Sequence, residues 1–194
     1  MTGDGEALRV AIDLLHMPSR VRQVRMGPLP QDVVFLLRIV AGDSSAMREA
    51  SQATDRSGEV IRNAAAFFIE QILLAAESDS YRVLGAASDA PPSELRRHMA
   101  LLMTWLHPDS AKEGHQSIFA NRVTMAWDDL KTAERRAAYD RGRQIKPMGR
   151  PNQRRQKALR RDFRIQVLRH NTNRYTHYGF LRRALQFLFG ARRS

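Results

Sequence analysis

Residues 98–110, HMALLMTWLHPDS, join an apolar helical pattern to three residues that end it. Leu95, Met99, Leu102 and Leu106 are spaced by 4, 3 and 4 residues, which places them on one face of an α-helix. Pro108 fixes its own φ and disfavours helix at His107, so the helix is predicted to end in a stiff turn. This turn would present the imidazole of His107 and the carboxylate of Asp109 outward.

Helical patterns continue on both sides of this turn. Upstream, residues 81–85 (YRVLG) predict a short helical turn that a glycine stops. Downstream, after a polar loop, a helix is predicted from the apolar spacing of Ile118, Phe119, Val123, Ala126, Trp127 and Leu130. Residues 133–141 predict a last short helix. Two antiparallel helices joined by a loop that carries His-Pro-Asp form a helical hairpin.

Together these residues resemble a known module. Residues 79–141 are similar to a J-domain, the module that defines DnaJ-type co-chaperones. The matching marks are Tyr81-x-x-Leu84-Gly85, the Leu/Met helix, His107-Pro108-Asp109, Ala126-Trp127-x-x-Leu130, and Arg136-Ala-Ala-Tyr139-Asp140. The tripeptide alone is a weak signal, and by itself it would fit a helix C-terminal cap. The whole ordered set is specific.

The resemblance implies a function without catalysis. The tripeptide would engage a DnaK-type chaperone ATPase of the heat-shock-70 class and stimulate its ATP hydrolysis. Asp109 would pair with an arginine of that partner, and His107 and Pro108 would hold the loop. We therefore predict a specialised co-chaperone that is not itself an enzyme. The client is left open.

The predicted helix that precedes the turn departs from the family pattern. Its solvent face would be rich in Lys and Arg in a J-domain, and here Arg96 and Arg97 are the cations on it. We predict that both contact the chaperone. Leu101 and Trp105 leave the helix apolar on a second face. They either pack on the rest of the chain or form a partner-binding anchor, since tryptophan is favoured at hot spots. The alternative functions are a degenerate J-like interaction scaffold without ATPase stimulation, or a protein that associates with nucleic acid or a membrane through its basic tail.

Residues 1–78 predict a separate N-terminal helical module. Helices are expected over 6–17, from about 31 to 42 and over about 45–53, the last capped by Asp43, Ser44 or Ser45. Residues 18–30 contain three prolines and a glycine and are predicted to be a loop. Ser57 precedes a long helix that is apolar on nearly every face and is therefore predicted to be buried.

Charge divides the chain unevenly. Residues 1–140 hold 16 Lys/Arg against 19 Asp/Glu, a net charge of −3, and residues 141–194 hold 16 Lys/Arg against one acid, a net charge of +15. We predict a basic linker and helical tail over 142–194. Its candidate phosphate- or anion-binding residues are Arg154, Arg155, Arg160, Arg161, Arg182 and Arg183. The tail would bind nucleic acid, an anionic membrane surface or a client, or it would be solvated or pack on the body.

The composition and the absence of certain motifs narrow the kinds of site and the cellular location that we expect. The chain has no cysteine, so disulfides and cysteine-ligated zinc are excluded. The six histidines show no metal-ligand spacing, and no phosphate-binding loop motif is present, so we expect no metal and no cofactor. No secretory signal or membrane-spanning run is apparent, which predicts a cytoplasmic protein, peripheral at a membrane if the tail binds one. The predicted fold is all-α: an N-terminal module, a J-domain hairpin and a basic extension.

Overall fold

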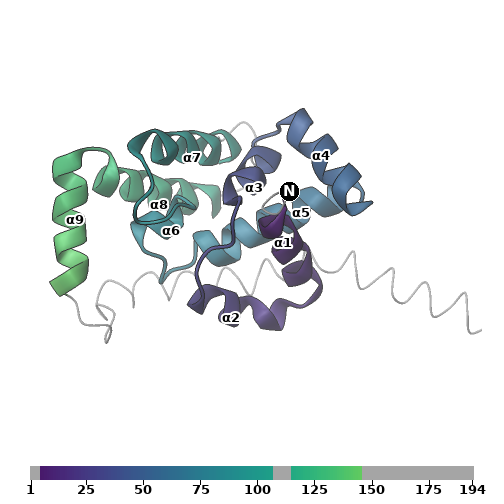
Figure 1. Ribbon diagram of the computed structural model, residues 1–194, viewed down its shortest axis with the longest axis horizontal. Helices are drawn as coiled ribbons and strands as arrows, with labels where there is room; N and C mark the ends of the chain where they lie inside the picture. Colours follow the sequence, from purple (N-terminus) through teal and green to yellow (C-terminus); the bar gives the residue numbers. More distant parts are fainter. Residues whose placement is uncertain (1–4, 107–114, 146–194) are drawn as a thin grey trace, which may run out of the picture. The chain divides into compact units, whose positions relative to one another are not determined.

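The described part of the chain is built from helices, as the spacing of its apolar residues predicts. The computed structural model describes residues 5–106 and 115–145, and no strand occurs among them (Figure 1). The prediction of an all-α fold is therefore confirmed. His107, Pro108 and Asp109 lie outside the described residues, as do the six candidate arginines of the basic tail.

Four of the N-terminal helices follow the sequence pattern closely. They are α1 (Glu6–His16), α3 (Val33–Val40), α4 (Ser44–Thr54) and α5 (Gly58–Phe68). The carboxylate of Asp43 caps α4, accepting hydrogen bonds from the backbone amides of Ser45 (2.9 Å) and Ala46 (3.1 Å). The hydroxyl of Ser57 caps α5 by accepting from the amide of Val60. Helix α5 packs against α1, α3 and α4.

The segment predicted to be a loop, residues 18–30, is partly helical. A 3₁₀ turn over Pro18–Arg20 leads into α2 (Val21–Met26), so that prediction was wrong. Proline at the first position is compatible with a helical turn. Val21 and Val24 pack against the hydrophobic core, and this burial stabilises a helix too short to form alone.

The long apolar helix predicted after Ser57 is not α-helical throughout. A π-helical turn, η2 (Ile69–Leu73), follows α5 and ends it. Arginines from two other helices bind carbonyls at this turn. Arg25 donates to the carbonyl of Gln71 at 2.6 Å, and Arg122 donates to the carbonyl of Leu74. Backbone acceptors at a helix end are thus satisfied by side chains distant in sequence.

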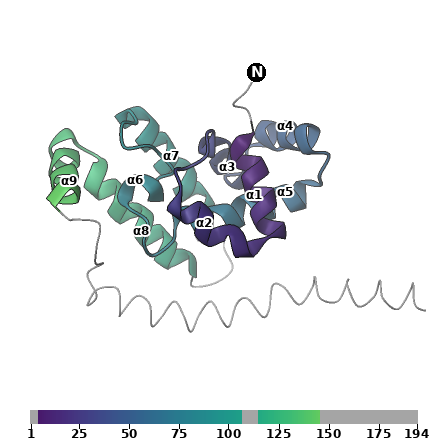
Figure 2. The ribbon, with the colours of Figure 1, turned by 60° about the horizontal axis from the view of Figure 1, so that its bottom comes forward.

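The second half of the described chain holds α6 (Ser80–Val83), α7 (Pro92–Trp105), α8 (His115–Leu130) and α9 (Ala133–Ile145). Helices α7 and α8 lie side by side and run in opposite directions (Figures 1 and 2). Their facing residues include Leu95, Leu102 and Leu106 from α7 and Val123, Ala126 and Leu130 from α8, all buried. The predicted hairpin geometry is therefore present on both sides of residues 107–114. Helix α9 extends four residues beyond its predicted end.

A single hydrophobic core runs through both halves. Helix α3 packs against α7, and one cluster of buried residues includes members of α1, α3, α4 and α5 as well as of α6, α7 and α8. Gly85 marks the closest approach. Its φ is +66°, and a Cβ built there would lie 2.8 Å from Cγ1 of Val33 and 3.2 Å from Cδ1 of Leu73. The domain boundary predicted between residues 78 and 79 marks a change in sequence pattern. Hydrophobic packing, however, continues across this position.

Candidate functional site

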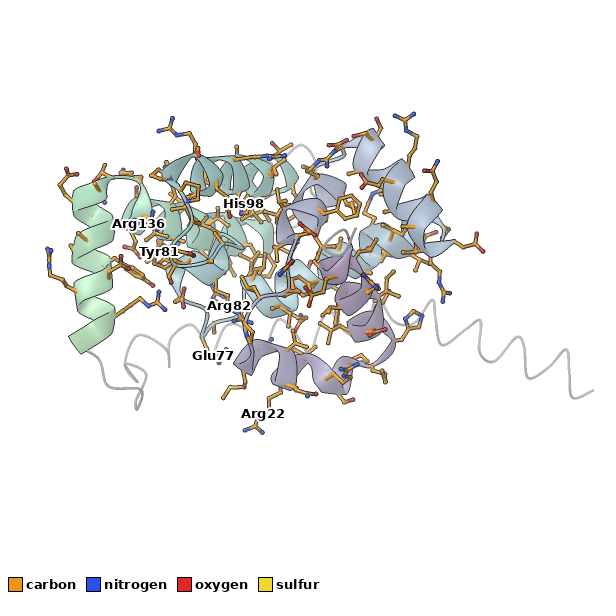
Figure 3. All side chains as sticks on the ribbon, viewed as in Figure 1. Arg22, Glu77, Tyr81, Arg82, His98 and Arg136 are labelled. Carbon is orange, nitrogen blue, oxygen red and sulfur yellow. The ribbon has the colours of Figure 1, made fainter. Side chains whose placement is uncertain are left out.

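Tyr81 lies at the centre of the motif residues that suggested the J-domain resemblance. Asp79 starts α6 by accepting a hydrogen bond from the backbone amide of Arg82 at 3.0 Å, which sets the direction of this short helix. Tyr81 on its first turn is only 2% exposed. Its ring packs edge-on against that of Tyr139, with the centroids 5.9 Å apart. Figure 3 shows Tyr81 facing α9.

Arg136 on α9 fastens that helix to Tyr81 and to the loop before α7. Its Nε donates to the hydroxyl of Tyr81 at 2.9 Å. Its Nη1 and Nη2 donate to the carbonyls of Ala90 and Ser88, each at 2.8 Å. The guanidinium carbon also lies 5.3 Å from the centroid of the Tyr81 ring. One side chain therefore uses its three nitrogens to join three segments.

Asp140 and Tyr139 complete the connection from the next turn of α9. The hydroxyl of Tyr81 donates to the carboxylate of Asp140, at 2.9 and 3.0 Å from its two oxygens. The hydroxyl of Tyr139 accepts from the backbone amide of Ser80 at 2.8 Å. Burial, and secondarily the Asp140 carboxylate, raise the pKa of the Tyr81 phenol above its ordinary value. The phenol therefore stays protonated and can donate to Asp140 while it accepts from Arg136.

We call Tyr81, Arg136, Tyr139 and Asp140 the tyrosine clasp. Arg143 extends it at the surface, where its guanidinium lies 3.3 Å from the carboxylate of Asp79 and over the Tyr81 ring. Ser80 adds a hydrogen bond from its hydroxyl to Asp129 of α8 at 2.7 Å. Motif residues separated by 55 to 59 positions are thus brought into direct contact. These contacts connect α6 to α8 and α9.

The α7 residues singled out from the sequence divide into exposed and covered side chains. Arg96 and Arg97 are exposed, as a contact with a partner requires. Ala100 and Thr104 are exposed further along the helix. Leu101 and Trp105 are half-buried and pack against the hydrophobic core. Their contacts fit the packing interpretation of these two residues.

One buried histidine and two partly buried arginines were not singled out as structural elements from the sequence. His98 is 4% exposed, and its Nδ1 donates to the carbonyl of Leu84 at 3.0 Å. Burial lowers the pKa of His98, which keeps its imidazole neutral. Arg82 donates to the carbonyls of Gly27 and Val24, both at 3.0 Å, and Arg122 to that of Leu74. Burial also lowers the pKa of both arginines. Their burial is the property that distinguishes these side chains, and the sequence alone does not show which side chains are buried.

A groove of about 620 Å³ lies between the loop before α3 and the start of α7. Asp32, Asp79 and Glu94 line it, together with Arg82, Arg97 and Arg143. The balance of three carboxylates against three guanidinium groups selects no ligand by charge. Among the described residues, no three His, Asp or Glu side chains are grouped so that they could hold a metal.

Comparisons with known protein families, with curated proteins and with solved structures found no match to this chain. Within residues 5–106 and 115–145, no helix combines the length and the apolar character needed to cross a bilayer.

Proposed function

We propose that this protein is a J-domain-type co-chaperone that recruits a DnaK-type ATPase and stimulates its hydrolysis of ATP. The observation that carries the proposal is the tyrosine clasp. The motif residues at positions 81, 136, 139 and 140 were matched to the family in sequence order alone, and they meet in one hydrogen-bonded cluster. A chance match of scattered residues would not require them to touch.

The position of the His107-Pro108-Asp109 tripeptide supports the same proposal. It follows directly on α7, and α8 begins at His115 on the other side. Because the two helices run side by side, the intervening residues 107–114 connect neighbouring helix ends. In this proposal Asp109 pairs with an arginine of the chaperone, a charge-assisted contact. Arg96 and Arg97 add positive charge on the exposed face of α7.

A J-like scaffold that binds partners without stimulating hydrolysis is the second candidate. The exposed side chains beyond Arg97 on α7 include Ala100 and Thr104, and the Thr104 hydroxyl donates to the carbonyl of Ala100 within its own helix. These positions supply no positive charge to steer an acidic partner. A scaffold would retain the hairpin without needing that charge.

Single-turnover ATP hydrolysis by a DnaK-type chaperone separates the two candidates. We expect the full-length protein to accelerate hydrolysis, and His107→Gln or Asp109→Asn to abolish the acceleration. His115→Gln is the matched control, because it makes the same substitution outside the tripeptide, at the first residue of α8. Hydrolysis that the wild-type protein leaves unchanged would favour the scaffold. Equal loss of acceleration in His107→Gln and His115→Gln would count against a specific role of the tripeptide.

A further inference from the structure

The segment between α1 and α3 carries an exposed surface that the proposed function does not use. We call it the α2 ledge and define it by Met17, Arg20, Arg22, Gln23 and Met26. Met26 is 85% exposed and Met17 is 47% exposed, and these are two of the three large hydrophobic side chains most exposed in the described part of the chain. Figure 3 shows Arg22 pointing away from the body.

The ledge is held in a fixed conformation by the body of the protein. Arg25 donates to the carbonyl and the side-chain oxygen of Gln71, at 2.6 and 3.2 Å. Arg82 donates to the carbonyls of Val24 and Gly27 at the end of α2. Because these contacts lie on the inner side, the outer residues are presented at little entropic cost to a partner.

The charge of the ledge has one sign. No acidic residue occurs between Asp13 and Asp32, while Arg20, Arg22 and Arg25 lie in that interval. The guanidinium of Arg20 lies 3.8 Å from the carboxylate of Asp13, and this exposed ion pair contributes little to stability. Arginine and methionine are both enriched at protein–protein interfaces relative to the remaining surface. An exposed methionine beside arginines therefore matches an acidic partner that also carries an apolar side chain.

A membrane surface fits the ledge less well. A helix that lies in a bilayer interface turns a broad apolar face outward. In α2 the apolar residues Val21 and Val24 face the core, and the outward positions are Arg22, Gln23 and Met26. The apolar exposure of the ledge is limited to Met17 and Met26, which suits cover by a protein side chain better than insertion into a bilayer.

We propose that the α2 ledge is a docking surface for an acidic segment of a partner protein. Arg20 and Arg22 meet carboxylates of that segment, and Met26 is covered by one of its apolar side chains. The proposed site includes none of residues 107–109, so it stands or falls independently of the chaperone proposal.

The absence of cysteine allows a site-specific test in the full-length protein. A single cysteine is introduced as Gln23→Cys, at an exposed position of the ledge, and is labelled with an environment-sensitive fluorophore, so that Met26 and both arginines stay in place. Met125→Cys on α8 is the matched control, because Met125 is also exposed, at 52%. The probe is a synthetic peptide of glutamates interrupted by leucines. Its controls are the same peptide with lysine for glutamate and a peptide of glutamates alone.

We expect the leucine-containing acidic peptide to shift the emission of the fluorophore at position 23 and to leave that at position 125 unchanged. Arg22→Glu in the Gln23→Cys background should weaken binding at least about threefold, the size of effect typical of an exposed charge. The basic tail can also attract the glutamate peptides, so the weakening caused by Arg22→Glu is the result that assigns binding to the ledge.

Three results would overturn the proposal. The first is an unchanged emission at position 23. The second is an equal shift at positions 23 and 125, which would indicate non-specific association. The third is a shift at position 23 with vesicles of phosphatidylserine and phosphatidylcholine but not with the peptide, which would assign the ledge to a membrane.

Discussion

Replacing Gly85 with alanine tests the packing of the two halves of the chain. Gly85 has a φ of +66°, a left-handed conformation that costs an L-residue about 1–2 kcal/mol. The added Cβ would also lie 2.8 Å from Cγ1 of Val33 on α3. Overpacking a dense core costs about 1–3 kcal/mol. We therefore expect Gly85→Ala to lower the free energy of unfolding by about 2–5 kcal/mol.

Gly42→Ala separates the backbone cost from the packing cost. Gly42 has a φ of +90°, and a Cβ there would meet no atom within 4 Å. This variant should lose only the backbone cost of about 1–2 kcal/mol. The difference between the two variants then measures the cost of pushing Val33 and Leu73 away from Gly85.

Urea unfolding followed by far-ultraviolet circular dichroism gives both free energies. Val33→Ala provides an internal check, because it removes the methyl group that the new Cβ would meet. The double variant should be more stable than the sum of the two single losses predicts. Equal losses in Gly85→Ala and Gly42→Ala, or additive losses in the double variant, would refute the close packing of α3 on Gly85.

The other predictions concern buried polar groups. Arg136→Lys should lower the free energy of unfolding by about 2–3 kcal/mol, since lysine cannot reproduce three hydrogen bonds from one planar group, and Arg135→Lys, its exposed neighbour, should change it by less than about 0.5 kcal/mol. The same urea titrations measure both, and equal effects would contradict the clasp. Burial holds the pKa of His98 in the folded protein below its ordinary value of 6.5. As the pH drops below about 6.5, the unfolded chain therefore binds a proton at this residue before the folded protein does, and the free energy of unfolding falls. His98→Asn keeps a donor for the Leu84 carbonyl and should remove that part of the decline; parallel stability–pH curves for the variant and the wild type would contradict it.

Local signals in the sequence predicted much of the helical structure. The spacing of Leu95, Leu102 and Leu106 placed one buried face of α7 correctly. Asp43, one of three candidate caps, accepts from first-turn amides of α4, and Ser57, which was noted only as preceding α5, does the same there. These features depend on residues a few positions apart, so a single sequence contains them.

The errors come from interactions between distant residues. Pro18 and Gly27 suggested a continuous loop, but contacts from Arg82, 55 and 58 positions away, and the burial of Val24 stabilise α2. The π-helical turn after α5 likewise accompanies arginine contacts 46 and 48 positions distant. Such partners cannot be read from local periodicity.

For the candidate site, the sequence identified the members of the tyrosine clasp but not their roles. Tyr81, Arg136 and Asp140 were recognised as family marks, and their mutual hydrogen bonds emerge only in three dimensions. Arg96 and Arg97 are exposed as a partner contact requires. The roles of His107, Pro108 and Asp109 remain predictions.

The guanidinium groups of Arg82 and Arg122 reach from the later helices to carbonyls at Gly27 and Leu74 in the earlier ones. A fragment that begins at residue 79 would leave both guanidinium groups without these carbonyl partners and would expose Leu84 and Gly85 to solvent. We therefore expect such a fragment to express poorly and to aggregate. We therefore expect that the segment that resembles a J-domain does not fold independently of the preceding helices. Any transplantation into another host protein would have to carry the preceding helices with it.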